Sequence, residues 1–86
     1  HGARVLILEG AVGAIASKER VEGFREKLTS QLPSATIVAS LSAEWDRLKA
    51  VSVMSDVLQR TPDLHLVYAA NDMMALGAVE ALRSAG

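Results

Sequence analysis

The chain has 86 residues, half of them hydrophobic and only 3% aromatic, and it contains no cysteine. Nine basic and ten acidic residues give a formal net charge of −1, so no excess positive charge attracts a nucleic acid or an anionic lipid surface. The missing cysteine excludes a disulfide framework and a thiolate metal site, and no apolar run approaches the roughly 20 residues that span a bilayer. We expect one small, soluble domain with a marginal core.

Three apolar runs predict strands at residues 4–9, 35–40 and 64–70, with the sequences RVLILE, ATIVAS and LHLVYAA. More than 20 residues separate one run from the next, which favours parallel strands joined by right-handed helical crossovers. The order β-α-β-α-β-α predicts an α/β class with three layers, α/β/α.

Helical spacing of apolar residues predicts the connecting segments. A first helix is expected to end at Pro33, because proline interrupts the helical hydrogen bonds. A second is expected from about residue 43 to residue 60, with Ser42 as its N-cap and with Glu44 and Asp46 in its first turn. A third is expected from residue 71 and packs through small side chains, namely Ala75, Ala78, Ala81 and Ala85.

A ligand of an open parallel sheet binds beyond the carboxyl ends of the strands, so the three strand-to-helix turns are the places to search. Gly10 and Gly13 in the first turn lack both the third glycine of a dinucleotide fingerprint and the lysine of a P-loop. We favour an ordinary tight turn there over a phosphate site. Arg20, further along, either offers its planar guanidinium to ring hydroxyls or a carboxylate, or is a solvated helix residue near Glu19 and Glu22.

Trp45 is expected opposite the apolar stripe of the second helix, which leaves its ring near the crevice. The ring either stacks on a sugar or a base, or packs against a neighbouring loop or domain. Asn71 and Asp72 end the third strand together, and one of them suffices as a helix cap. We assign the structural cap to Asp72 and the crevice role to Asn71, whose carboxamide both donates and accepts hydrogen bonds.

No catalytic residue, metal or cofactor is expected, and the chain is not predicted to be an enzyme. His65 lies within the predicted third strand without a serine or carboxylate at triad spacing. Glu9 and Asp72 are carboxylates above the sheet, but nothing beyond their position marks them for acid–base catalysis.

The blocks LEGAVGA (8–14), WDRLKA (45–50) and AANDMMALG (69–77) resemble sugar-binding periplasmic proteins of the ribose, allose and galactose type, which serve ABC importers. The resemblance covers nearly the whole chain and corresponds to the first half of the carboxyl-terminal lobe, so residues 1–86 are expected to be a single partial domain. It implies the type 1 periplasmic-binding fold with strand order 2-1-3, an ABC permease as partner and a periplasmic parent protein, with no signal peptide in this chain.

By the same resemblance, Arg20 and Asn71 hydrogen-bond the hydroxyl groups of a monosaccharide such as ribose, allose or galactose, and Trp45 stacks on its ring. Closure of two lobes about a hinge then clamps the sugar. Because one lobe supplies about half of the contacts, the isolated chain is expected to bind sugar weakly or not at all. Its open sheet edges are expected to cause self-association, which sedimentation at two concentrations would measure.

Three other classes of function remain open from the sequence. An effector-binding domain of a lactose-repressor-type transcription regulator shares the fold, and a helix-turn-helix upstream would favour it over the importer. An α/β enzyme or phosphoacceptor domain would need an acidic cluster that only Glu9 and Asp72 approximate. An assembly module would use the sheet edges alone.

Overall fold

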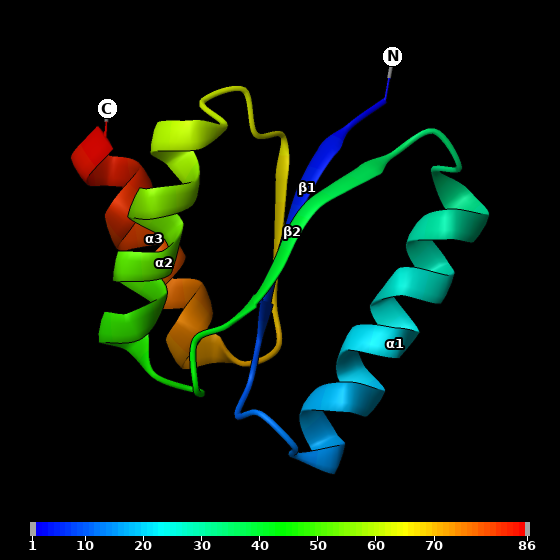
Figure 1. Cartoon of the computed structure of the whole chain (residues 1–86), viewed down its shortest axis with the longest axis horizontal. Helices are drawn as coiled ribbons and strands as arrows, with labels where there is room; N and C mark the ends of the chain where they lie inside the picture. The colour runs from blue at the N-terminus through cyan, green and yellow to red at the C-terminus, as the bar shows by residue number, and fades with distance from the viewer. Residues whose placement is uncertain (1, 86) are drawn as a thin grey trace.

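Three parallel strands in the order β2-β1-β3 form the middle layer of the fold. In the computed structural model, which describes residues 2–85, one helix covers one face of this sheet and two helices cover the other (Figure 1). The predicted α/β/α class and 2-1-3 strand order are therefore confirmed. The elements along the chain are β1 (Arg4–Glu9), α1 (Ile15–Gln31), β2 (Thr36–Ser42), α2 (Arg47–Arg60), β3 (Leu66–Ala69) and α3 (Asp72–Ala85).

Strand β1 is the centre of both the sheet and the core. Its residues 5–8 have no exposed surface, as expected for a strand of a parallel sheet that is covered on both faces. Successive side chains of a strand point to opposite faces. Leu6 and Leu8 join a buried cluster with Met54 of α2 and Met74 of α3, and the alternate residues of β1 face α1.

Helices α2 and α3 approach each other closely because small residues lie at their contact. A Cβ atom added to Gly77 would lie 2.3 Å from the carbonyl oxygen of Arg47 and 2.8 Å from the Cβ atom of Ala50. Beside this contact, Arg47 Nη2 lies 2.8 Å from Glu80 Oε1. Both of those side chains are nearly half exposed, so this ion pair contributes little to stability.

Helix α1 is held on the opposite face of the sheet by apolar and aromatic contacts. Val21 and Leu28 are buried, and the rings of Phe24 and Tyr68 stack with centroids 4.3 Å apart and planes 9° from parallel. The Tyr68 hydroxyl also donates a hydrogen bond of 3.4 Å to the carbonyl oxygen of Arg20. This pairing fixes the first half of α1, which carries Arg20, against β3.

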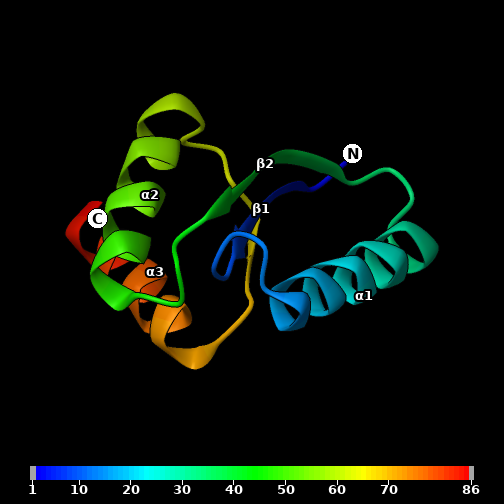
Figure 2. The ribbon, with the colours of Figure 1, turned by 60° about the horizontal axis from the view of Figure 1, so that its bottom comes forward.

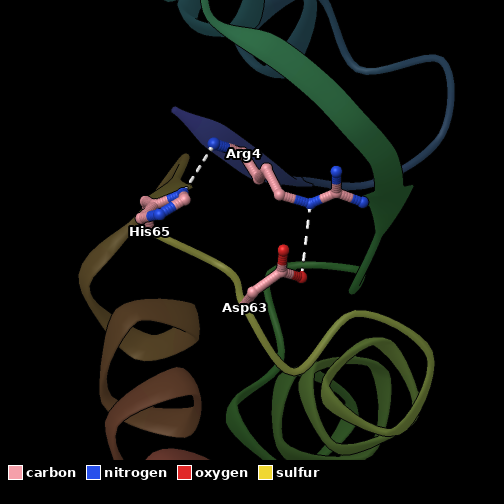
Figure 3. Close-up of polar contacts among 3 residues, drawn as sticks. All are labelled: Arg4, Asp63 and His65. Atoms are coloured by element: carbon pink, nitrogen blue, oxygen red, sulfur yellow. Dashed lines mark hydrogen bonds and ion pairs between the residues drawn. The ribbon is translucent and has the colours of Figure 1, made fainter. Parts of the chain in front are cut away.

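At the amino ends of the strands, polar contacts join β1 to the segment before β3 (Figure 3). The Arg4 N–H donates to His65 Nδ1 at 3.0 Å, and the His65 N–H donates to the carbonyl oxygen of Arg4 at 2.9 Å. Arg4 Nε lies 3.3 Å from Asp63 Oδ1. His65, predicted within the third strand, is instead exposed and precedes β3 (Leu66–Ala69).

The second helix begins later than predicted. Ser42, the predicted N-cap, is the last residue of β2, and Glu44 precedes the helix with φ of 56°. A residue with this φ cannot belong to a right-handed helix. Asp46 is the N-cap of α2 instead, and its carboxylate accepts a hydrogen bond of 2.8 Å from the Lys49 N–H.

We predict that Gly77→Ala destabilises the chain by about 1–3 kcal/mol, because the added methyl group meets a backbone oxygen that cannot move alone. The matched control is Gly23→Ala in α1, where an added Cβ atom meets no atom within 4 Å. There the better helix propensity of alanine should stabilise by about 0.5–1 kcal/mol. Urea unfolding followed by far-UV circular dichroism measures both, and equal effects would contradict the close α2–α3 contact.

Candidate ligand site at the carboxyl edge of the sheet

The three strand-to-helix turns lie together at the carboxyl edge of the sheet, which faces the viewer in Figure 2. In a parallel sheet all strands end at the same edge, so their turns are neighbours in space although they are far apart in sequence. The turns comprise residues 10–14, 43–46 and 70–71. Each one supplies or orients one of the three side chains that the sequence analysis selected.

The first turn is stabilised by its own hydrogen bonds. The Ala14 N–H donates to the carbonyl oxygen of Ala11 at 3.1 Å, and Gly13 has a positive φ of 84°, as the third position of a type II turn requires. The buried hydroxyl of Ser17 accepts a hydrogen bond of 2.8 Å from the Gly10 N–H. The turn is therefore anchored to the first part of α1.

The second turn places two consecutive non-glycine residues in the left-handed region. Glu44 has φ of 56° and Trp45 has φ of 60°, and the Asp46 N–H closes the turn on the carbonyl oxygen of Ala43 at 2.8 Å. This conformation costs roughly 1–2 kcal/mol for each residue that carries a Cβ atom. Trp45 was predicted within the second helix, opposite its apolar stripe. It lies instead in a strained turn before α2.

The indole of Trp45 packs on the backbone of Gly10. A Cβ atom added to Gly10 would lie 2.4–2.5 Å from three successive atoms of the six-membered ring of the indole. Nearly equal distances to these atoms put the added carbon over the ring rather than at its edge. Only glycine leaves room for the ring here, and the indole remains partly buried at the rim instead of sealed in the core.

Arg20 joins the first helix to the other two turns. Its Nη1 donates a hydrogen bond of 2.9 Å to the carbonyl oxygen of Ala70, and its Cζ lies 5.6 Å from the centroid of a Trp45 ring, over the indole. Its contacts in the described chain are with these residues rather than with Glu19 or Glu22. The guanidinium has several N–H donors, so one bond orients it and others are available to a ligand.

Asn71 caps the third helix in addition to lying at the rim of the crevice, which was the only role predicted for it. Its Oδ1 accepts a hydrogen bond of 2.9 Å from the Met74 N–H, so Asn71 is the N-cap of α3. The prediction that Asp72 is the cap is wrong, because Asp72 is already the first helical residue. Its exposed carboxylate lies in the first turn, where its negative charge interacts favourably with the helix dipole. Asn71 Nδ2 also points to the rim and donates a hydrogen bond of 3.4 Å to the carbonyl oxygen of Trp45.

Glu44 connects the first two turns, a role that the sequence analysis missed. Its Oε2 lies 2.8 Å from the Ser42 hydroxyl and 3.2 Å from the Val12 N–H, both of which can donate to it. The hydrogen bond from Ser42, followed by that from Val12 and the charge of Lys49, lowers the pKa of the Glu44 carboxyl below its ordinary value of 4.5. The spacing Ser42-x-Glu44 was the only signal in the sequence.

Within residues 2–85, no group of three or more histidine, aspartate or glutamate side chains could hold a metal ion. In the same part of the chain, none of the helices has the length and apolarity to cross a membrane.

Glu9, at the end of β1, accepts a hydrogen bond of 2.5 Å from the Ser40 hydroxyl of the neighbouring strand.

An aromatic ring, a guanidinium and a carboxamide thus meet at the carboxyl edge of an open parallel sheet, an arrangement of ligand-binding α/β domains. The chain matches the family described as periplasmic binding protein domain over residues 1–86. It belongs to that family, as the resemblance in the sequence implied.

The match with each curated relative covers only part of that relative's length. The chain is 42% identical over 86 residues to the ribose import binding protein RbsB of Escherichia coli (strain K12), covering 100% of this chain and 28% of that protein. It is 46% identical over 85 residues to RbsB of Bacillus subtilis (strain 168), covering 99% and 27%. It is also 42% identical over 88 residues to the D-allose-binding periplasmic protein of Escherichia coli (strain K12), covering 100% and 27%. The chain therefore spans just over a quarter of these relatives.

Solved structures show the same likeness. A periplasmic sugar-binding protein from Pseudomonas fluorescens superposes with a TM-score of 0.93 at 35% identity, covering 100% of this chain and 26% of that one. An ABC transporter periplasmic solute binding protein from Actinobacillus succinogenes, solved with bound D-allose, superposes with a TM-score of 0.89 at 39% identity, covering 99% and 29%.

We predict that Gly10→Ala displaces the Trp45 indole and destabilises the chain by about 1–3 kcal/mol, because the methyl group and the ring occupy the same space. Trp45 is the only tryptophan, so its fluorescence reports the displacement as a shift of emission to longer wavelength. Gly23→Ala serves as the control that leaves the emission unchanged. An unaltered spectrum for Gly10→Ala would show that the indole does not rest on Gly10.

Proposed function

We propose that this chain is part of the carboxyl-terminal lobe of a monosaccharide-binding protein of an ABC importer, and that Arg20, Trp45 and Asn71 contact the sugar. The observation that carries the proposal is the convergence of these three side chains from α1 and from the second and third turns, with the Arg20 guanidinium 5.6 Å from the ring centroid of Trp45. The names of the ribose and allose import relatives support a sugar as ligand.

The chemistry of the three groups suits a neutral sugar. The Trp45 indole is only partly buried, and it offers an apolar surface for the C–H face of a sugar ring, worth about 1 kcal/mol beyond burial. Arg20, already oriented by Ala70, has further N–H donors for hydroxyl oxygens. Asn71 uses its oxygen as a helix cap and one amide N–H towards Trp45, and its second amide N–H remains for a hydroxyl group.

These contacts come from one side of the ligand only. One stacking contact of about 1 kcal/mol and a few hydrogen bonds of roughly 1.5–3 kcal/mol each are comparable with the loss of translational and rotational freedom, which costs about 4–15 kcal/mol, so little net affinity remains. Since the chain spans just over a quarter of its relatives, the rest of the site would come from a second lobe and later strands. Hinge closure of the lobes around the sugar would then present the closed form to a membrane permease in the periplasm.

The transcription-regulator alternative receives no support from the relatives described above, which are named as import or periplasmic binding proteins. No catalytic role is proposed for any residue. The edge of β3 and α3 supports self-association of the isolated chain, because an apolar groove of about 370 Å³ lies along it. Its lining includes Leu64, Leu66, Val67, Val79 and Leu82.

We predict that calorimetric titration of the isolated chain with D-ribose, D-allose or D-galactose gives no measurable binding. A chimera in which the 86 residues replace the aligned segment of the Bacillus subtilis ribose protein should bind one of these sugars. In that chimera Trp45→Ala should weaken binding about tenfold or more, equivalent to at least about 1.4 kcal/mol.

The matched control is Leu48→Ala, because Leu48 is 72% exposed at the start of α2 and is not one of the three residues assigned to the sugar. It should leave the affinity unchanged. A folded chimera, verified by circular dichroism, that binds none of the sugars would refute sugar binding. Equal affinities for the Trp45→Ala and Leu48→Ala chimeras would refute the assigned role of Trp45.

A further inference from the structure

The position of Trp45 depends on a backbone conformation that its own sequence does not favour. Glu44 and Trp45 both have a positive φ, and neither is glycine. Such a conformation persists only where the surrounding structure holds it. The contacts of Glu44, as well as those of the indole itself, therefore hold Trp45 in place.

The side chain of Glu44 supplies such a restraint. Its Oε2 lies within hydrogen-bond distance of the Val12 N–H of the first turn and of the Ser42 hydroxyl at the end of β2. The Glu44 N–H points back to Ser42 Oγ at 3.3 Å, and Ser42 Oγ also lies 2.6 Å from the carbonyl oxygen of Gly10. A hydroxyl has a single proton, so the two acceptors compete for it, and a charged carboxylate is the stronger acceptor.

These hydrogen bonds connect the first turn with the second turn, whose relative positions determine where the indole lies. Gly10, on which the ring rests, belongs to the same turn as Val12, and the Glu44 carboxylate bonds that turn directly. We infer that Glu44 is a positioning residue. Its carboxylate bonds the first turn to the second, a link that we call the clip, and this link holds the Trp45 indole over Gly10 in the orientation that sugar stacking needs. The clip itself rests on the geometry, and its effect on affinity rests on the proposed function.

The charge state of Glu44 gives the clip a recognisable pH dependence. Hydrogen bonds from Ser42 and Val12, with the charge of Lys49 on α2, lower the pKa of Glu44 below 4.5, against a smaller opposing effect of burial. A lowered folded pKa means that the stabilisation is complete above 4.5 and is lost as the pH falls through the lower folded value. The clip is therefore intact at neutral pH.

The test compares Glu44→Ala with Glu44→Gln, and uses Glu26→Ala as the control because Glu26 is exposed on α1 away from the site. Near-UV circular dichroism and fluorescence of Trp45 are recorded on each chain without sugar. Glu44→Ala should change both Trp45 signals at neutral pH, whereas Glu44→Gln, which keeps an acceptor oxygen, should restore them. The unaltered chain should show an acid transition of the Trp45 signals below pH 4.5 that Glu44→Gln lacks.

The sugar affinity of the chimera then measures the consequence for binding. Glu44→Ala should weaken binding about tenfold, and Glu44→Gln should recover most of it, while urea unfolding reports any general loss of stability separately. Trp45 signals that are the same in Glu44→Ala and Glu26→Ala overturn the inference. If Glu44→Ala does not fold, the acid transition of the unaltered chain and its loss in Glu44→Gln decide the matter.

The outcomes for the inference and for the proposed function are separable. A chimera that binds no sugar, with Trp45 signals that respond to Glu44→Ala, refutes sugar binding and supports the clip. A chimera that binds sugar with the same affinity in Glu44→Ala and Glu26→Ala supports sugar binding and overturns the positioning role.

Discussion

The contact between the Trp45 indole and the backbone of Gly10 is the constraint on which the carboxyl edge of this structure depends. An added Cβ atom on Gly10 would overlap the ring, so the residue of the first turn that lies against the indole must have no side chain. The indole reaches that place from a left-handed turn at Glu44 and Trp45. Arg20 and Asn71 then contact the same residue, one through the ring and the other through the carbonyl oxygen.

The general architecture explains why three distant parts of the chain can meet at all. Parallel strands end at one edge, and each of the three turns at that edge begins a helix that packs back on the sheet. The stacking of Phe24 on Tyr68 fixes α1, and with it Arg20, relative to the end of β3. As a result, the three side chains that we propose as one wall of a sugar site are already oriented by contacts within the protein.

Much of the fold was predictable from the sequence, because long apolar runs and their spacing determine parallel strands and crossovers. The turn at Trp45 was not, since Ala43, Glu44 and Trp45 are compatible with a helix and no glycine marks the left-handed residues. Tertiary contacts with Gly10 and Val12 override the local preference. The cap of α3 was misassigned for a smaller reason. Asn71 and Asp72 are both good caps, and only the position at which β3 ends decides between them.

The most direct measurement of the central claim is a nuclear Overhauser spectrum of the chain in solution without sugar. The account predicts cross-peaks between the indole protons of Trp45 and the α-protons of Gly10, which should also shift upfield because they lie over the ring. It further predicts cross-peaks from the indole to the side chain of Arg20. Gly10 α-protons at ordinary shifts, with no cross-peak to Trp45, would contradict it.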